Sequence, residues 1–144
     1  FSVVAVSLKK KDAIRAVLAA LRPVTSRELV IVIGAGGDRD RGKRPLMGQI
    51  SAELADRVII TDDNPRSEDP AMIRADMVAG IATDTPLSLI EGRRAAIEFA
   101  LAHAVAGDTI VVAGKGHETG QEIAGVVHPF DDRAVVRELL EEMS

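Results

Sequence analysis

The stretch that decides the fold is "LVIVIG", Leu29 to Gly34. Its apolar residues do not alternate with polar ones and most of them are β-branched, which is typical of a strand that is covered on both faces. The run ends at a glycine, after which the chain becomes polar and charged. The stretch therefore predicts a central strand of a parallel sheet with helices on both sides.

The segments on either side of this run alternate in the same way. Short apolar runs predict further strands at residues 2–7, 57–61, 86–90 and 108–114. Apolar residues at helical spacing predict helices at 11–22, 46–56, 68–81, 93–105 and 132–143, and a small hairpin is expected within 114–132. Alternation of strand and helix predicts an α/β fold, a Rossmann-like open, mostly parallel sheet with helices on both faces. We expect a single domain that spans residues 1–144.

Composition narrows the functional classes. The 144 residues are 47% hydrophobic and 28% charged, which favours a globular domain. Aromatic residues make up only 2% and the net charge is −4, so nucleic-acid binding is disfavoured. There is no cysteine for a disulfide or a thiolate metal site. No apolar run reaches the roughly 18 residues of a membrane span and no signal peptide pattern opens the sequence, so a cytoplasmic protein without a membrane partner is expected.

Three loops are candidates for a ligand site. In open α/β sheets, ligands bind beyond the carboxyl ends of the strands. The loops that follow these ends are 34–45, 61–70 and 113–120, and they are also the polar and glycine-rich loops of the sequence.

The first loop has the outline of a phosphate-binding P-loop, because Gly37 is followed after four residues by Gly42 and Lys43. Arg44, however, stands where a P-loop needs a hydroxyl group to ligate Mg²⁺. The four spacer residues are all charged, whereas tight wrapping around phosphate favours small ones. A P-loop is therefore disfavoured, and a solvated charged turn remains open. The loop still offers cations near a strand end, namely Arg39, Arg41, Lys43 and Arg44.

The second loop is "TDDNPRSEDP", residues 61–70. Asp and Asn before Pro65 are sufficiently explained by a tight turn, because their side chains bond nearby backbone. A turn does not explain Arg66. Carboxylate, amide and guanidinium groups presented together could hold a zwitterion, with its ammonium group on Asp63 and its carboxylate on Arg66.

The third loop, "AGKGHETG", combines close backbone approach at Gly114 and Gly116 with charge from Lys115, His117 and Glu118. His117 and Glu118 are adjacent and lack the spacing of a common metal motif. No metal site is therefore expected in this chain.

Together the loops resemble a known family. "GAGGDRDRGKRPLMG", "TDDNPRSEDP", "AGKGHETGQ" and "HPFDDR" are similar to segments of the C-terminal domain of the Mur ligases, in the same order from about Asp12 onward. The resemblance implies an ATP-dependent acid–amino-acid ligase of peptidoglycan synthesis. It also implies that N-terminal and central ATP-binding domains precede this one, outside this chain, and that the isolated domain is inactive.

The resemblance also implies a substrate. In this family Asp63-Asn64-Pro65-Arg66 marks members that take meso-diaminopimelate rather than lysine and add it to UDP-N-acetylmuramoyl-L-alanyl-D-glutamate. The UDP-linked substrate, ATP and Mg²⁺ would be held mainly by the other domains, and no catalytic residue is assigned here. The residues assigned to the incoming amino acid are Arg39, Asp63, Asn64, Pro65, Arg66, Gly114 and Glu118.

The sequence departs from the family pattern at one place. Val6-Ser7-Leu8-Lys9 stands where members carry Asp-Tyr-Ala-His, and Lys11 stands where they carry Pro. In the family this segment faces the nucleotide and the central domain. A non-catalytic amino-acid-binding module derived from such a ligase is therefore an alternative. An unrelated α/β phosphate-binding protein is a second one.

Overall fold

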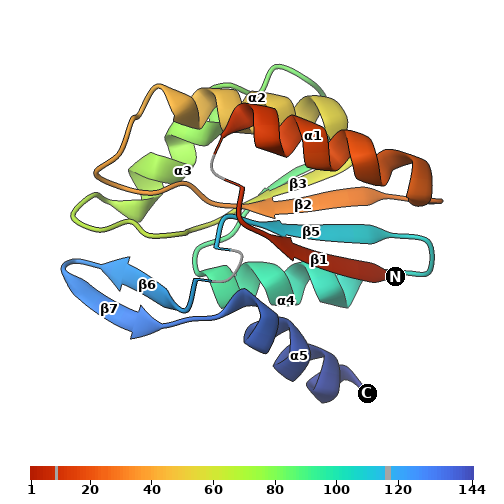
Figure 1. Ribbon diagram of the computed structural model, residues 1–144. Helices are drawn as coiled ribbons and strands as arrows, with labels where there is room; N and C mark the ends of the chain where they lie inside the picture. Colours follow the sequence, from red (N-terminus) through yellow and green to blue (C-terminus); the bar gives the residue numbers. More distant parts are fainter. Residues whose placement is uncertain (9, 116–117) are drawn as a thin grey trace.

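The computed structural model describes residues 1–8, 10–115 and 118–144, which form a parallel sheet covered by helices (Figure 1). The five strands lie in the order β1-β5-β2-β3-β4 and every neighbouring pair is parallel. They are β1 (Ser2–Val6), β2 (Leu29–Ile33), β3 (Arg57–Ile60), β4 (Leu87–Leu89) and β5 (Thr109–Ala113). The predicted fold class is confirmed.

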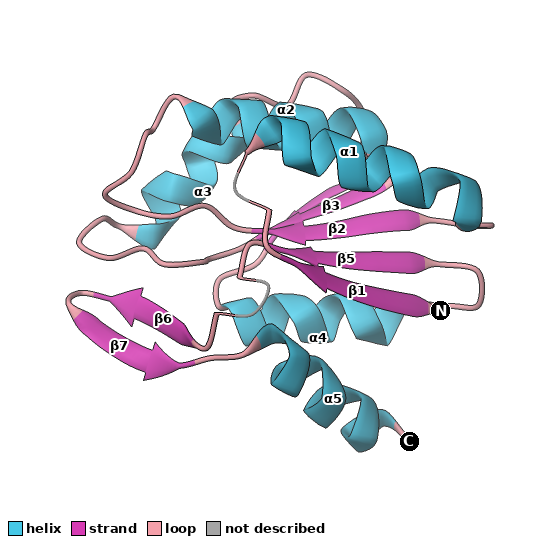
Figure 2. Ribbon diagram, viewed as in Figure 1, coloured by secondary structure: helices cyan, strands magenta, loops and turns pink. Residues whose placement is uncertain are grey.

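The helices cover the two faces of the sheet unequally (Figure 2). Three of them, α1 (Lys11–Leu21), α2 (Lys43–Leu54) and α3 (Pro70–Val78), lie on one face. The other face carries α4 (Arg93–His103) and α5 (Asp132–Met143). Pro23 ends the first helix, as the sequence predicts, and a short 3₁₀ turn, η1 (Arg22–Val24), follows it.

Strand β2 shows why its sequence decides the fold. Its five residues are all buried. Ile31 and Ile33 pack into the core beneath α1, α2 and α3, whereas Val30 and Val32 pack against α4 and α5. Because successive side chains of a strand point to opposite faces, an unbroken apolar run supplies both cores at once.

Two helices begin at aspartates that cap their first turn. Asp69 accepts a hydrogen bond from Ala71 N at 2.9 Å, and Pro70 occupies the first position of α3. Of the two aspartates available to cap α5, Asp131 does so by accepting from Arg133 N at 3.0 Å. Asp132 is fully buried and has a different role.

A hairpin follows the last strand of the sheet. It consists of β6 (Gly120–Ile123) and β7 (Val126–Pro129), which pair antiparallel and lie beyond the carboxyl ends of the sheet strands (Figure 1). The backbone of Arg66 is bound to β6: Arg66 N donates to Glu122 O at 2.9 Å, and Ala124 N donates to Arg66 O at 2.7 Å. The hairpin therefore fixes the 61–70 loop from outside the sheet.

Candidate functional site

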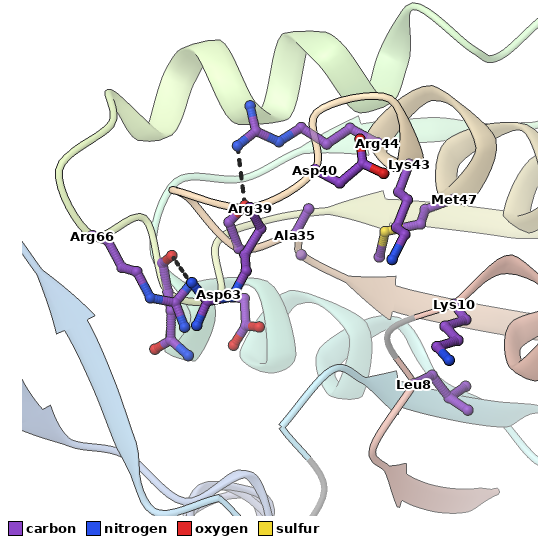
Figure 3. A pocket seen from close by; sticks show the side chains of 13 residues that line it. Leu8, Lys10, Ala35, Arg39, Asp40, Lys43, Arg44, Met47, Asp63 and Arg66 are labelled. Carbon is purple, nitrogen blue, oxygen red and sulfur yellow. Dashed lines mark hydrogen bonds between the residues drawn. The ribbon is translucent and has the colours of Figure 1, made fainter.

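A cavity of about 240 Å³ opens where strands β1, β2 and β3 end (Figure 3). Figure 3 places Arg66 and Asp63 on one side of it, and Leu8 and Lys10 on the other. Carboxyl ends of parallel strands are the expected position for a ligand in such a sheet. The lining residues are Leu8, Lys10, Gly34, Ala35, Gly36, Arg39, Asp40, Lys43, Arg44, Met47, Asp63, Asn64 and Arg66.

Arg44 corrects the prediction for the first loop. Helix α2 begins at Lys43, so Arg44 lies in its first turn rather than in a loop. Its side chain is only 2% exposed. It donates to Glu68 at 2.7 Å and to Asp76 at 2.9 Å, and also to Gly36 O at 3.0 Å. Its charge is therefore used inside the protein and is not offered to a phosphate.

Glu68 joins the first loop to the second. Besides Arg44, its carboxylate accepts a hydrogen bond from Asp38 N and pairs with Arg41 at 2.9 Å. The hydrogen bond from Arg44, followed by that from Asp38 N, lowers the pKa of Glu68 from 4.5 to about 2. Asp38 in turn accepts from the Ser67 hydroxyl. Asp38 and Arg41 are solvent-exposed, as a solvated charged turn predicts, and they also bind the second loop.

Close backbone contact also joins the two loops. Gly37 N donates to Asn64 O at 2.7 Å. A Cβ atom on Gly37 would lie 1.9 Å from Pro65 O, so this position admits only glycine. Pro65 therefore contributes by shaping the contact between the loops, and it is absent from the lining of the cavity.

Arg66 lines the cavity with part of its guanidinium group still available. Its backbone has a positive φ of 53°, a conformation that is uncommon for residues other than glycine. The side chain, 17% exposed, donates to Gly37 O at 2.8 Å and pairs with Glu122 at 3.8 Å. Arg39 lies nearby in the first loop and is more exposed; it donates to Asp38 O at 3.0 Å.

Asp63 and Asn64 reach the cavity but are nearly buried, with 5% and 8% of their surface exposed. The Lys115 ammonium group lies 2.9 Å from Asp63 Oδ1 and donates to Asn64 Oδ1 at 3.2 Å. Gln121 Nε2 donates to Asp63 O at 2.6 Å. Asp63 therefore already has an ammonium partner within the chain.

Gly114 and Glu118 lie outside the cavity lining. Gly114 has a φ of 132°, and a Cβ atom there would lie 3.8 Å from Asp63 Cγ and 3.5 Å from Arg93 Nη2. Glu118 N donates to Lys115 O at 2.9 Å. Both residues thus belong to the loop that carries Lys115. Of the seven residues predicted to bind the amino acid, the structure brings four to the cavity: Arg39, Asp63, Asn64 and Arg66.

A buried ion pair supports the site from below, and the sequence analysis missed it. Arg93 donates to both carboxylate oxygens of Asp132 at 2.7 Å, and both side chains are fully buried. The same guanidinium group donates to Ala113 O at 3.2 Å and Asp62 O at 3.3 Å. The sequence contains one indication of this ion pair. Arg93 begins α4, and a basic residue in the first turn of a helix opposes the helix dipole, so it needs an acidic partner.

The segment that departs from the family pattern contributes a wall of the cavity. Val6 ends β1, and Leu8 is 5% exposed and packs into the core beneath α1 and α2. Lys10 lines the cavity. Lys9 lies outside the described residues.

The sequence analysis also considered a metal site at His117 and Glu118. His117 and Gly116 lie outside the described residues. Within residues 1–8, 10–115 and 118–144, no group of three or more His, Cys, Asp or Glu side chains is placed to hold a metal ion. Among the same residues, no helix is long and apolar enough to cross a membrane.

Comparison with known proteins relates this geometry to a family. Residues 9–116 match the family described as "Mur ligase, glutamate ligase domain". The chain is 60% identical over 130 residues to the UDP-N-acetylmuramoyl-L-alanyl-D-glutamate–2,6-diaminopimelate ligase of Caulobacter vibrioides, covering 90% of this chain and 26% of the relative. It is 55% identical over 139 residues to the same-named ligase of Streptomyces avermitilis, covering 92% of this chain and 27% of the relative.

A solved structure agrees with these relatives. The structure of a UDP-N-acetylmuramoyl-L-alanyl-D-glutamate–2,6-diaminopimelate ligase superposes with a TM-score of 0.95 and 48% identity, covering 98% of this chain and 29% of that one. The chain thus spans about a quarter of the length of the curated relatives that it matches. Since the family match covers residues 9–116, the chain belongs to the Mur ligase family, as a glutamate ligase domain.

Proposed function

We propose that this chain is the C-terminal domain of an ATP-dependent ligase that adds meso-diaminopimelate to UDP-N-acetylmuramoyl-L-alanyl-D-glutamate in peptidoglycan synthesis. The observation that carries the proposal is the position of the Arg66 and Arg39 guanidinium groups, which line one cavity at the carboxyl ends of the strands. The names of relatives with 60% and 55% identity support it.

In this proposal the cavity binds the incoming amino acid. Diaminopimelate carries two carboxylates and two ammonium groups, so its site needs hydrogen-bond donors for the carboxylates and acceptors for the ammonium groups. Arg66 and Arg39 bind carboxylate, for which the guanidinium fork is suited. Glu118, which belongs to the neighbouring loop and not to the cavity lining, is the proposed acceptor for an ammonium group. The proposed binding residues are Arg39, Asp63, Asn64, Pro65, Arg66, Gly114 and Glu118.

The domain's contribution to the reaction is to position the amine. An amine held close to the activated carboxyl carbon reacts in an effectively unimolecular step, which accounts for several kcal/mol of rate enhancement in enzymes, up to about 7–11. The carboxyl substrate is held by domains outside this chain. In this proposal residues 1–144 form a single domain, and this domain alone positions the amine of the incoming amino acid.

The first loop does not fit ATP and Mg²⁺ in the way that a P-loop would. Arg44 occupies the position of the P-loop hydroxyl group, and its guanidinium is buried against Glu68 and Asp76. A cation at that point repels Mg²⁺. We therefore propose that ATP and Mg²⁺ are bound mainly outside this domain. We also propose that the ATP-dependent reaction takes place in the cytoplasm.

A second candidate is a non-catalytic amino-acid-binding module derived from such a ligase. Val6 favours it, since this apolar side chain packs against the core at the position where family members carry the Asp of Asp-Tyr-Ala-His. Both candidates use the same amino-acid site. Turnover by a complete ligase of this family that ends in this chain separates them.

Titration of the 144-residue chain tests the amino-acid site directly. We expect meso-diaminopimelate to shift the NMR amide signals of Arg39, Asn64 and Arg66, and lysine to do so only at higher concentration. Arg39→Ala should weaken binding, because Arg39 lines the cavity. Arg41→Ala is the matched control: Arg41 lies in the same loop but pairs with Glu68. Absence of any shift at these residues, up to the solubility limit of diaminopimelate, would overturn the proposal.

A further inference from the structure

Lys115 differs from the other buried cations of the described chain in what it contacts. Arg44 and Arg93 bind carboxylates that do not line the cavity, namely Glu68 with Asp76 and Asp132. Lys115 is fully buried, yet both side chains that it contacts line the cavity. It lies directly behind the proposed amino-acid site without reaching it.

The contacts of Lys115 determine what Asn64 can offer a ligand. Asn64 Oδ1 accepts from Lys115 Nζ at 3.2 Å and from Glu122 N at 2.9 Å. Two donors on the same atom identify it as the amide oxygen and fix the plane of the amide group. The part of Asn64 left for the cavity is its NH₂ group, which can only donate. Asn64 is therefore suited to a carboxylate and not to an ammonium group.

The contact of Lys115 with Asp63 determines the net charge on the side of the cavity formed by residues 63–66. Asp63 Oδ1 is buried and accepts no well-aligned hydrogen bond from the described residues. Its negative charge is instead balanced by the Lys115 ammonium group, which lies 2.9 Å away. Lys115 is held in place by a third oxygen, Gly120 O, at 2.8 Å. With Asp63 neutralised, the cationic groups of Arg39 and Arg66 dominate this side of the cavity. Both effects of Lys115 favour an anionic ligand group.

We propose that Lys115 is a positioning residue that makes the 63–66 turn selective for a carboxylate, by orienting the Asn64 amide as a donor and by neutralising Asp63. The role of Lys115 rests on the proposed function and adds a specific selectivity to it: Asn64 and Arg66 bind the carboxylate that distinguishes diaminopimelate from lysine. Asp63 contributes to this selectivity through its ion pair with Lys115.

Kinetics of a complete ligase ending in this chain test the role of Lys115. Lys115→Met removes the ammonium group while keeping the length of the side chain. Loss of a hydrogen bond to a charged group corresponds to about 10–100-fold in binding. We expect the KM for diaminopimelate to rise by about that factor, with kcat changing less. The KM for lysine, which lacks the second carboxylate, should change less, so the preference for diaminopimelate falls.

The double variant Lys115→Met with Asp63→Asn separates charge from folding. It leaves no unpaired buried carboxylate, so the protein should fold even where the single variant does not. We expect it to recover part of the lost preference, because only the orientation of Asn64 is then missing. Equal rises in KM for both amino acids, in a variant with an unchanged thermal midpoint, would overturn the inference. A parent ligase that does not incorporate diaminopimelate would instead overturn the proposed function.

Discussion

Arg44 and Arg66 contact neighbouring carbonyl groups of the same loop, but they use their charges differently. Arg44 donates to Gly36 O and is surrounded by the carboxylates of Glu68 and Asp76 at 2.7 and 2.9 Å. Arg66 donates to Gly37 O, and its ion pair with Glu122 is long, at 3.8 Å. A buried guanidinium paired with two carboxylates serves the framework. One held mainly by a carbonyl keeps its charge available for a ligand.

Removal of Arg44 should give the largest effect, and it should act on stability. Arg44→Met leaves Glu68 and Asp76 without their buried partner, which by analogy with broken buried pairs costs about 3 kcal/mol in the free energy of unfolding. Urea unfolding followed by circular dichroism measures this. The matched control is Arg41→Met. Arg41 also pairs with Glu68, but its side chain is 73% exposed, so its loss should cost less than about 1 kcal/mol. Similar losses for both variants would contradict a framework role for Arg44.

Removal of Arg66 should act on selectivity instead. Arg66→Ala should lower the preference for diaminopimelate over lysine by about 10–100-fold, as expected for the loss of hydrogen bonds to a charged group. Arg66→Lys should recover only part of it, because an ammonium group cannot reproduce a two-pronged contact. Incorporation of both amino acids by a complete ligase gives the ratio. An equal decline for both substrates would mean that Arg66 shapes the turn, which would make it resemble Arg44.

Acid should weaken the Arg44 framework, with the smallest of the three effects. The folded-state pKa of Glu68, about 2, lies below its ordinary value of 4.5. Its contribution to stability is therefore fully present above pH 4.5 and is lost as the pH falls from 4.5 toward 2. Glu68→Gln should flatten this part of the stability profile. Thermal midpoints between pH 6 and pH 2 test this, and parallel profiles for the two proteins would exclude Glu68 as a source of the pH dependence.

Most of the fold could be predicted from the sequence because its signals are local. The apolar run of β2, the Asp69-Pro70 start of α3 and the stop at Pro23 each depend on neighbouring residues only. The apolar spacing predicts a helix that starts at Leu46, three residues after the observed start of α2 at Lys43. Charged residues suggested a loop there, although Pro45 is well suited to the first turn of a helix, whose N–H groups are unpaired anyway.

The candidate site could be predicted less completely because burial of a charge depends on distant partners. The sequence around Lys115 and Arg44 is typical of exposed, charged loops. Both side chains are buried in the structure, where Lys115 pairs with Asp63 and Arg44 pairs with Glu68, each of them distant in the sequence. The family resemblance indicated loops of which two contribute residues to the cavity lining. It did not indicate which charges face the ligand and which face each other, since both arrangements have the same residue types.

The attachment of the hairpin to Arg66 bears on how freely this domain can change during evolution. The two hydrogen bonds that join Arg66 itself to the hairpin run between main-chain atoms. A side-chain replacement at Ile123 therefore leaves these donors and acceptors in place. Gln121 allows less freedom, because its side chain donates to Asp63 O. Gly37 allows none, because any side chain there would collide with Pro65 O. Sequence changes should thus accumulate at the exposed hairpin positions, such as Val126 and Val127, while the orientation of Arg66 is inherited unchanged.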